Sequence, residues 1–407
     1  MKMLKLSPYC LPEQESSTHL TNDLTAAFLA NGITIENYVP TPTRGVSNEV
    51  RRKYRKIKYE ELEGGRIVIH RFTMFQERKN SIQRAIRYIL VNTIQYFKGS
   101  HAKGIDIIYA ASTPPTQGLL CGLVKKRLKV PFVYDLQDIF PDSLVNAKMT
   151  SKGSIIWKIG RKIENFTYRN ADKIIVISED FKTNIMEKGV PESKIEVIPN
   201  WINTDRVYPI ERKNNIIFDR YKLDRNKFYV CYSGNLGHSQ NLDLLVEVAE
   251  EIQETMPDLM FVLIGEGAAK KDLELLVKRK NLKNIVILPF QSYKDIAHVF
   301  SFGDVGLIIS KPGIGASSVP SKTWGIMAAE RPILASFDMN SELAKVISET
   351  NSGFVADAGN KELFINALKE IVASAGEMGK NGRKYVLDNL SKDICTAKWI
   401  KVIKEVV

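Results

Sequence analysis

Hydrophobic and polar positions follow two alternating patterns along the chain. Short runs rich in β-branched and aromatic residues alternate with longer segments in which apolar residues recur every three or four positions. The short runs predict strands at residues 33–39, 66–72, 105–112, 132–138, 173–179, 228–234, 259–267, 284–290, 304–310 and 331–337. Helices are predicted between them, for example at 82–98 and 241–256. This alternation is typical of parallel sheets covered by helices.

The length of 407 residues indicates two domains, since single cores stop growing at about 250–300 residues. Pro199, Pro209 and the polar residues around Asn214 mark a linker near 200–215. We therefore predict an α/β fold of two Rossmann-like domains with parallel sheets that face a central cleft. The first domain spans 1–205, the second spans 206–389, and a last helix at 390–407 packs back on the first.

Composition argues against several classes of protein. No stretch approaches the roughly 18–20 apolar residues that cross a bilayer, and the start of the chain becomes polar too quickly for a signal peptide. The 4 cysteines are far apart, which favours a reducing cytoplasm over disulfides or a zinc site. The 5 histidines do not cluster with carboxylates and no Asp-x-Asp occurs, so we expect neither a metal nor another cofactor.

The net charge of +12 lies mostly in the first half. Residues 1–200 carry 31 Lys and Arg against 20 Asp and Glu, whereas the rest of the chain carries 27 against 26. A basic first half indicates an anionic partner. Lys and Arg mix with Tyr, Ile and Phe at 51–59 and 77–103, which suits docking on an anionic membrane surface. An ordinary helix with a solvated charged face is the alternative.

The segment 311–332 places glycines, serines and a proline directly ahead of a short apolar helix. We expect this helix to begin near Pro320, so that its free N–H groups and the positive end of its dipole face a ligand. Lys322 adds a full charge. Hydroxyl donors come from three serines, Ser317, Ser318 and Ser321. These features predict a diphosphate site; a capped core helix after a flexible loop is the alternative.

Two further glycine loops follow predicted strands of the same half. Gly234 and Gly237 come after residues 228–232, and Gly265 and Gly267 come after 259–263. Because the carboxyl ends of parallel strands meet at one edge of a sheet, the three loops should converge. Each loop alone could be a structural turn, but together they favour a nucleotide-type ligand.

The first half offers acidic and hydroxyl groups at corresponding places. Three residues precede its first helix: Glu15, Ser16 and Ser17. Ser17 or Thr18 could simply be the N-cap of that helix. Three aspartates lie in or just after the strand predicted at 132–138: Asp135, Asp138 and Asp142. Such residues can serve a reacting centre or cap helices, and we favour Asp138 for function.

Long segments of the chain follow one another as they do in a known family. After "VISEDFKTNIMEKGVPESKIEVIPNWINTDRVYP" come "YSGNLGHSQNLDLLVEVAEEI", "FVLIGEGAAKKDLE", "NIVILPFQSYKDIAHVFSFGDVGLIIS" and "VPSKTWGIMAAERPILA". The chain resembles the GT-B glycosyltransferases of the retaining family 4 over nearly its whole length. Its last segment is similar to the subgroup that builds bacterial O-antigen, capsule or exopolysaccharide, including the N-acetylfucosamine transferases.

The resemblance implies a role for each matched position. The donor's nucleotide diphosphate would be held by Gly234, Asn235, Gly265, Glu266, Gly267, Ser317, Ser318, Val319, Pro320, Ser321 and Lys322. Phe290 and Gln291 would lie where the base is recognised, and Asp138 would lie near the transferred sugar. From the first domain, the diphosphate would be faced by Glu15, Ser16 and Ser17.

The chain departs from the family pattern at several of these places. The family's two glutamates, eight positions apart, correspond to Ser317 and Gly325. Its usual Arg and Lys after the strand at 228–232 correspond to Asn235 and Gln240. The glycine pair of the first-domain loop is absent, and Glu330 stands where glycine is usual. Lys322 is therefore the main visible cation for the phosphates.

The implied reaction moves a sugar from a nucleotide diphosphate to an acceptor hydroxyl, with retention of anomeric configuration and without a metal. Lys322 and fixed N–H groups would stabilise the leaving diphosphate, while Asp138 would position the reactants. The subgroup implies a UDP-linked donor, with an N-acetylated deoxy-hexosamine as the sugar, and a lipid-linked saccharide as acceptor. Such an enzyme would work in the cytoplasm, at the inner face of the cell membrane.

Other functions remain open on the sequence alone. A nucleotide-sugar epimerase of the same fold would also bind a diphosphate, but would leave the basic first half unexplained. A nicotinamide oxidoreductase would need a G-x-G-x-x-G after the first strand, which is absent. A basic non-enzymatic anion-binding protein would not need three phosphate loops. We expect no nucleic-acid partner, because the basic residues come without a recognisable binding motif.

Overall fold

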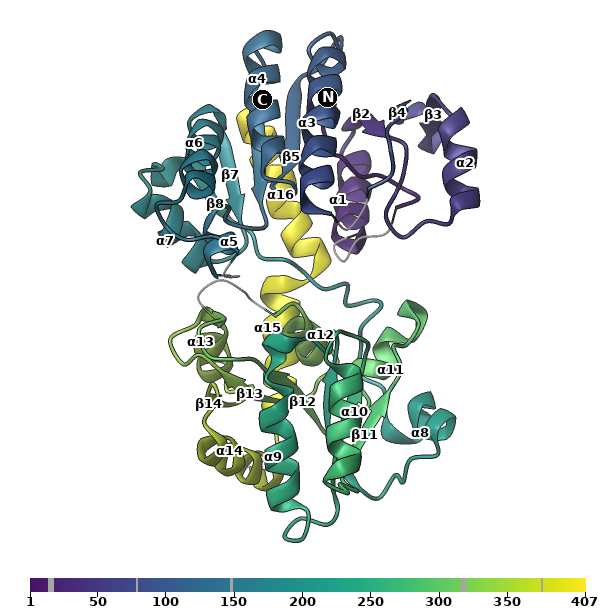
Figure 1. Cartoon of the computed structure of the whole chain (residues 1–407), viewed down its shortest axis with the longest axis vertical. Coiled ribbons are helices and arrows are strands. Elements are labelled where there is room, and N and C mark those ends of the chain that lie inside the picture. The colour runs from purple at the N-terminus through teal and green to yellow at the C-terminus, as the bar shows by residue number, and fades with distance from the viewer. Residues whose placement is uncertain (14–17, 78–79, 147–148, 316–319, 375) are drawn as a thin grey trace. The chain divides into compact units, whose positions relative to one another are not determined.

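The computed structural model describes residues 1–13, 18–77, 80–146, 149–315, 320–374 and 376–407. The chain divides into two compact units, Met1–Pro199 with Cys395–Val407, and Asn200–Ile394. Each unit contains one β-sheet covered by helices (Figure 1). The predicted fold class, an α/β chain of two Rossmann-like domains, is confirmed. None of the helices in the described ranges has the length and apolar character needed to cross a membrane.

The first unit has an eight-stranded sheet in the order β3-β4-β2-β1-β5-β6-β7-β8. Its strands are β1 (Lys2–Lys5), β2 (Thr34–Pro40), β3 (Tyr59–Leu62), β4 (Ile67–Phe72), β5 (Ile107–Ala111), β6 (Phe132–Leu136), β7 (Lys173–Val176) and β8 (Ile195–Val197). Neighbours pair in parallel except β3 and β4, which are antiparallel at one edge. The strand order reverses between β1 and β5, which marks the carboxyl edge there as the usual place for a ligand.

Helices cover both faces of this sheet. They are α1 (Thr18–Ala30), α2 (Asn48–Lys56), α3 (Ser81–Gly99), α4 (Thr116–Leu128), α5 (Asp142–Asn146), α6 (Ile155–Asn170), α7 (Glu179–Glu187) and α16 (Lys392–Val406). Side chains alternate along a strand, so Ile108 of β5 packs with the α4 residues Leu120 and Cys121 while Tyr109 points to the other face. There Phe28 of α1 and Trp399 of α16 pack on Tyr109, with ring centroids 6.1 and 5.8 Å away.

The second unit has a six-stranded sheet in the order β11-β10-β9-β12-β13-β14, parallel throughout. Its strands are β9 (Phe228–Ser233), β10 (Leu259–Ile264), β11 (Ile285–Leu288), β12 (Val305–Ile309), β13 (Ile333–Phe337) and β14 (Gly353–Asp357). Its helices are α8 (Ile216–Tyr221), α9 (Leu242–Ile252), α10 (Lys270–Arg279), α11 (Ile296–Phe300), α12 (Lys322–Ala328), α13 (Glu342–Glu349), α14 (Lys361–Ser374) and α15 (Met378–Tyr385). The order reverses between β9 and β12, so the residues that follow these two strands lie where such sheets bind ligands.

Candidate active site

Two glycine loops of the second unit lie against each other at the carboxyl edge of the sheet. The loop after β9 contains Gly234, whose φ of +146° favours glycine, and the loop after β10 contains Gly265. The N–H of Gly234 donates to the carbonyl of Ile264 at 3.0 Å. A Cβ on Gly265 would overlap the carbonyl oxygen of Gly234. Glycine is therefore required at 265 by the contact between the loops.

The same two loops stay in contact further along. The N–H of Leu236 donates to the carbonyl of Glu266 at 2.8 Å, and a Cβ on Gly267 would overlap the carbonyl of Leu236. The Glu266 carboxylate pairs with Lys270 on α10 at 2.7 Å. The structure thus brings together two of the predicted glycine loops. The Glu266 carboxylate is paired with the helix that follows its own loop.

Neutral residues shape the first loop where the family has cations. The hydroxyl of Tyr232 donates to the carbonyl of Asn235 at 2.8 Å. The side-chain oxygen of Gln240 accepts the N–H of Gly237 at 3.0 Å. These contacts fix the turn after β9 without adding positive charge, so any charge complementary to a phosphate must come from elsewhere.

Lys322 begins α12 and its amine reaches this first loop. The Nζ atom lies 3.8 Å from the centroid of the Tyr232 ring and 3.2 Å from the place that a Cβ on Gly234 would occupy. Burial lowers the pKa of Lys322 to about 7, and no carboxylate pairs with it in the ranges that the structure describes. The sequence analysis expects a full charge on Lys322, whereas this desolvation favours the neutral amine. An arriving anion would favour the charged form.

Helix α12 begins two residues later than the sequence predicts. Pro320 and Ser321 belong to the turn before the helix, where the N–H of Thr323 donates to the carbonyl of Pro320 at 3.0 Å. The expected start near Pro320 is therefore corrected to Lys322, within the usual margin for a helix end. Ser317, Ser318 and Val319 lie outside the described residues, so their roles stay predictions.

Gly325 occupies the place of the family's second glutamate. It is buried within α12, and a Cβ there would lie 2.5 Å from the ring of Phe300 on α11. A glutamate at this position would require Phe300 to move. The loss of the carboxylate is thus tied to a packing contact between α11 and α12.

Asp338, which follows β13, is a residue that the sequence analysis missed. Its two oxygens accept the N–H groups of Gly313 and Gly315, at 2.9 and 2.6 Å. This carboxylate fixes the glycine segment that leads toward α12. The available signal was an aspartate at the carboxyl end of the strand beside β12, but nothing in the sequence shows that the two strands are neighbours.

Phe290 and Gln291 follow β11 and differ in what they present. Phe290 is 70% exposed. Gln291 is buried, with its oxygen accepting from Arg220 at 2.6 Å and its amide nitrogen donating to the hydroxyl of Tyr221 at 2.7 Å. The Gln291 amide is engaged inside the unit, so of the predicted pair it is Phe290 that exposes its side chain.

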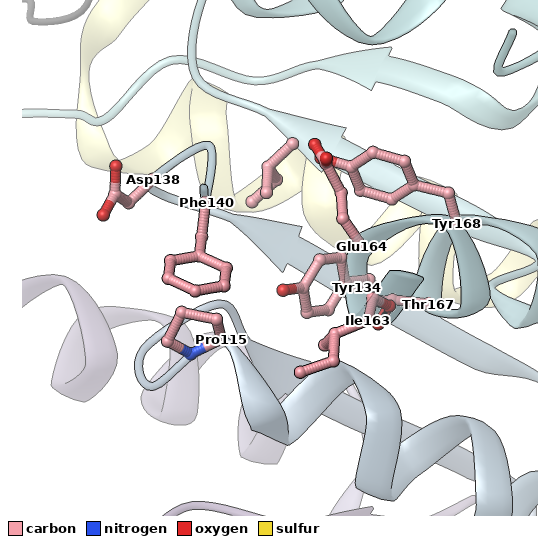
Figure 2. A pocket seen from close by; sticks show the side chains of 9 residues that line it. Pro115, Tyr134, Asp138, Phe140, Ile163, Glu164, Thr167 and Tyr168 are labelled. Atoms are coloured by element: carbon pink, nitrogen blue, oxygen red, sulfur yellow. Dashed lines mark hydrogen bonds between the residues drawn. The ribbon is translucent and has the colours of Figure 1, made fainter. Parts of the chain in front are cut away.

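Asp138 lies in the first unit, after β6, at one side of a small pocket (Figure 2). Its backbone N–H donates to the hydroxyl of Ser112 at 3.1 Å. Desolvation raises the pKa of Asp138, although a hydrogen bond with Ser143 opposes the rise. The cavity volume of the pocket is only about 10 Å³, and the pocket reaches Glu164 and Tyr168 at its other side. Ligand pockets for small molecules measure about 300–1,000 Å³, so this one is too small for a sugar nucleotide.

The two neighbouring aspartates have partners within the first unit. Asp135 is buried and accepts from Tyr109 at 3.0 Å and from Gln137 at 2.7 Å; burial raises its pKa to about 6. Asp142 pairs with Lys188 at 2.7 Å. Both contacts give these residues structural roles.

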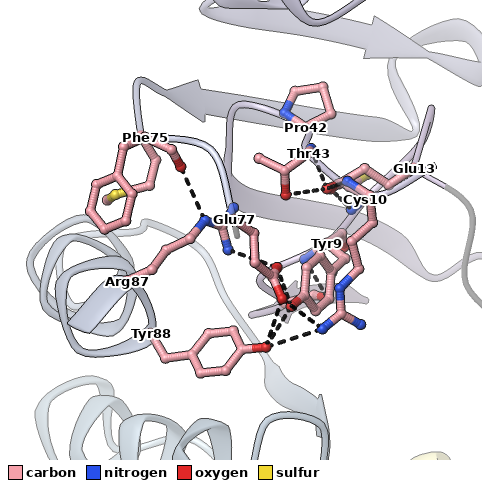
Figure 3. A network of polar contacts seen from close by, with 12 residues as sticks. Tyr9, Cys10, Glu13, Pro42, Thr43, Phe75, Glu77, Arg87 and Tyr88 are labelled. Atoms are coloured by element: carbon pink, nitrogen blue, oxygen red, sulfur yellow. Dashed lines mark hydrogen bonds and ion pairs between the residues drawn. The ribbon is translucent and has the colours of Figure 1, made fainter. Parts of the chain in front are cut away.

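A second polar centre, the Glu77 network, joins loops that follow β1, β2 and β4 to helix α3 (Figure 3). It comprises Tyr9, Arg44, Glu77, Arg87 and Tyr88. Glu77 accepts from Tyr9 and pairs with Arg44, both at 2.9 Å, and Tyr9 and Tyr88 bond through their hydroxyls at 2.7 Å. Arg87 is fully buried, 3.7 Å from Glu77. Desolvation would raise the pKa of Glu77, but hydrogen bonds from Arg44 and Tyr9 lower it overall.

The loop after β1 is also held by Glu13, which accepts the N–H groups of Thr43 and Arg44 at 2.6 and 3.0 Å (Figure 3). The predicted site residues Glu15, Ser16 and Ser17 come directly after it and lie outside the described residues. In the described ranges no group of three His, Cys, Asp or Glu side chains is placed to hold a metal ion.

Comparisons with known proteins place this chain in a class. Residues 19–206 match the family described as Glycosyltransferase Family 4, and residues 213–385 match Glycosyl transferases group 1. The chain is thus a nucleotide-sugar-dependent glycosyltransferase of GT-B fold. It belongs to the family 4 glycosyltransferases, whose members are generally retaining and metal-independent.

Individual relatives are distant. The "Probable glycosyltransferase WbjE" of Pseudomonas aeruginosa is 25% identical over 75% of this chain and 76% of its own. The UDP-Gal:α-D-GlcNAc-diphosphoundecaprenol α-1,3-galactosyltransferase of Escherichia coli is 26% identical over 73% of this chain and 75% of its own. Among solved structures, Anabaena HepE in complex with UDP matches with a TM-score of 0.74 over 100% of both chains, at 14% identity. This last likeness is one of fold.

Proposed function

We propose that this chain transfers a sugar from a UDP-linked donor to a hydroxyl of a lipid-linked saccharide during synthesis of a bacterial surface polysaccharide such as O-antigen or capsule. The observation that carries the proposal is the Lys322 amine, which lies beside the loop after β9 without a carboxylate partner in the described ranges. Such a group suits the diphosphate of a nucleotide sugar. Relatives support the choice: HepE was solved with UDP, and the E. coli galactosyltransferase is named for a diphosphoundecaprenol-linked acceptor.

In the proposed mechanism the second unit binds the donor and the first binds the acceptor. The diphosphate would lie at the switch between β9 and β12, where its negative charge returns a proton to Lys322. As the glycosidic bond breaks, charge grows on the leaving diphosphate and the ammonium stabilises it without reorganisation. Phe290 would stack on the base, and Asp138 would position the transferred sugar.

The sugar and the location are finer parts of the proposal. The similarity of residues 319–333 to the subgroup supports an N-acetylated deoxy-hexosamine as the transferred sugar. The surplus of Lys and Arg in residues 1–200 supports a cytoplasmic enzyme that works at the inner face of the cell membrane. A panel of UDP-sugars, scored by UDP release in the presence of a lipid-linked acceptor, identifies the donor.

A thermal-shift assay with UDP, GDP, ADP and NAD tests the donor site. A ligand at 100 times its dissociation constant adds about 2.7 kcal/mol of stability. We expect UDP to raise the melting temperature of the wild type and Lys322→Ala to lose most of that rise. Lys345→Ala, which removes an exposed lysine of α13, is the matched control and should keep it. A shift with NAD alone, or an equal UDP shift in Lys322→Ala, would overturn the proposal.

A further inference from the structure

Helix α3 exposes apolar side chains and buries polar ones. Four large apolar residues stand out, Ile82, Ile86, Ile89 and Phe97, which are 72, 48, 61 and 62% exposed. On the opposite side Arg87 and Gln95 are fully buried. The Gln95 amide donates to the carbonyls of Ser7 and Tyr38 at 2.8 and 2.7 Å. Surface helices of globular proteins show the reverse arrangement, so the apolar stripe of α3 is available to a partner outside the unit.

Two neighbouring helices extend this surface. Helix α4 lies between α3 and α6 and packs on both (Figure 1). Its packing on α6 is close, because a Cβ on Gly118 would overlap Thr167 and one on Gly122 would lie 2.8 Å from Phe166. Helix α6 also exposes three isoleucines at its start, Ile155, Ile156 and Ile159. We call the surface formed by α3, α4 and α6 the three-helix face.

The charge of the three-helix face is almost entirely positive. Apart from the buried Arg87, its helices carry the basic residues Arg84, Lys98, Lys125, Lys126, Arg127, Lys158, Arg161, Lys162 and Arg169. Their one acidic residue is Glu164, which is buried and paired with Arg161 and Lys188. Exposed isoleucines among Lys and Arg, with no exposed carboxylate on the same helices, suit an anionic lipid surface.

Three exposed leucines of the second unit lack this basic setting. Leu275, Leu363 and Leu387 are exposed on three separate elements. Each has an acidic residue beside it in the sequence, Glu274, Glu362 and Asp388 respectively. A carboxylate next to each leucine opposes binding to anionic lipid, so these three positions provide a matched control.

We infer that the three-helix face docks on the surface of an anionic lipid bilayer, with the α3 and α6 isoleucines among the headgroups and the Lys and Arg side chains on the phosphates. This inference rests on the proposed function, which places the enzyme at the inner face of the cell membrane, and it names the surface that makes the contact. Of the two segments that the sequence analysis relates to membrane docking, 51–59 and 77–103, the inference selects the second. Helix α2 is basic but exposes no large apolar residue, whereas α3 is basic and exposes several.

The test measures co-sedimentation of the full chain with two kinds of vesicle, pure phosphatidylcholine and a mixture with about one third phosphatidylglycerol. We expect binding to the mixed vesicles that weakens as salt is raised. The variant Ile82→Ser, Ile86→Ser, Ile89→Ser should lower the partition coefficient at least about tenfold, since three exposed apolar side chains are lost. The control Leu275→Ser, Leu363→Ser, Leu387→Ser should leave it unchanged.

Several results would overturn the inference. The inference fails if the wild-type protein does not bind the mixed vesicles. It also fails if the partition coefficient falls equally in the α3 variant and its control. A concentration-dependent dimer in sedimentation velocity that the α3 variant abolishes would assign the face to a second copy instead. UDP-induced thermal stabilisation is measured on the same samples: if it is absent while vesicle binding follows the expected pattern, the donor proposal fails and the docking face stands.

Discussion

Each unit of this glycosyltransferase keeps basic side chains near the carboxyl edge of its sheet, but in opposite electrostatic settings. In the first unit, Arg44 and Arg87 face the carboxylate of Glu77 and two tyrosine hydroxyls. In the second, Lys322 faces an aromatic ring and a glycine loop, with no acidic partner in the described ranges. The pKa of Glu77 is lowered by its partners, whereas burial lowers that of Lys322 to about 7.

This contrast separates two uses of a desolvated charge. A cation with its counter-ion built in holds loops together, and losing one partner leaves the other uncompensated. A cation without one is costly in the empty protein and becomes favourable when an anion arrives. We therefore infer that the Glu77 network holds the first unit's loops, and the contrast supports the proposal that Lys322 binds the donor.

The largest expected loss of stability is that of Glu77→Gln. Removing this carboxylate leaves the fully buried Arg87 without the negative charge that it faces, which should lower the free energy of unfolding by about 3 kcal/mol. Urea denaturation measures the loss. The control Glu192→Gln breaks an exposed pair with Lys182 and should change the free energy of unfolding far less. Similar costs for the two variants would mean that the network does not hold the loops.

Lys322→Met should alter how the free energy of unfolding depends on pH. With a pKa of about 7 in the folded chain and about 10.4 unfolded, the unfolded lysine binds the extra proton between these values. The stability of the wild type relative to the variant should therefore rise with pH across this window, by up to about 1.4 kcal/mol per unit. Lys345→Met, at an exposed position, should show no such trend. A flat difference for Lys322→Met would contradict the unpaired, desolvated amine.

A smaller effect concerns the end of the helix that carries Lys322. Glu330 has a φ of 59°, the left-handed region, at the position where the family has glycine. Glu330→Gly should raise stability by about 1 kcal/mol because the strain of a side chain in this conformation disappears. Glu330→Ala keeps that strain and serves as the control. Equal melting temperatures for the two variants would contradict the claim that the φ of residue 330 strains the backbone.

Local pattern was enough to predict the fold class, because strands such as β5 and β12 are short buried runs and the helices between them keep a period near four. Lys322 could also be predicted as a candidate site residue, since it follows a glycine-rich, serine-rich segment. Its charge state could not be predicted, because the amine is buried against Tyr232 and Gly234, some 90 residues away in sequence. A desolvated pKa depends on such tertiary neighbours.

The Glu77 network and Asp338 escaped prediction for the same reason. Tyr9, Arg44 and Glu77 come from three separate loops, and each alone is an unremarkable polar residue. Asp338 acts on Gly313 and Gly315 because β12 and β13 are neighbours in the sheet. Only the strand order reveals which loops meet.

The most direct test of the central claim is a calorimetric titration of UDP at about pH 8 in buffers of different ionisation enthalpy. At this pH the amine of Lys322 is mostly neutral, and binding of the diphosphate should return its proton. The account predicts uptake of about one proton by the wild type and almost none by Lys322→Met, whose affinity should also fall. UDP binding by the wild type without proton uptake, or equal uptake in the variant, would contradict the assignment of Lys322 to the diphosphate.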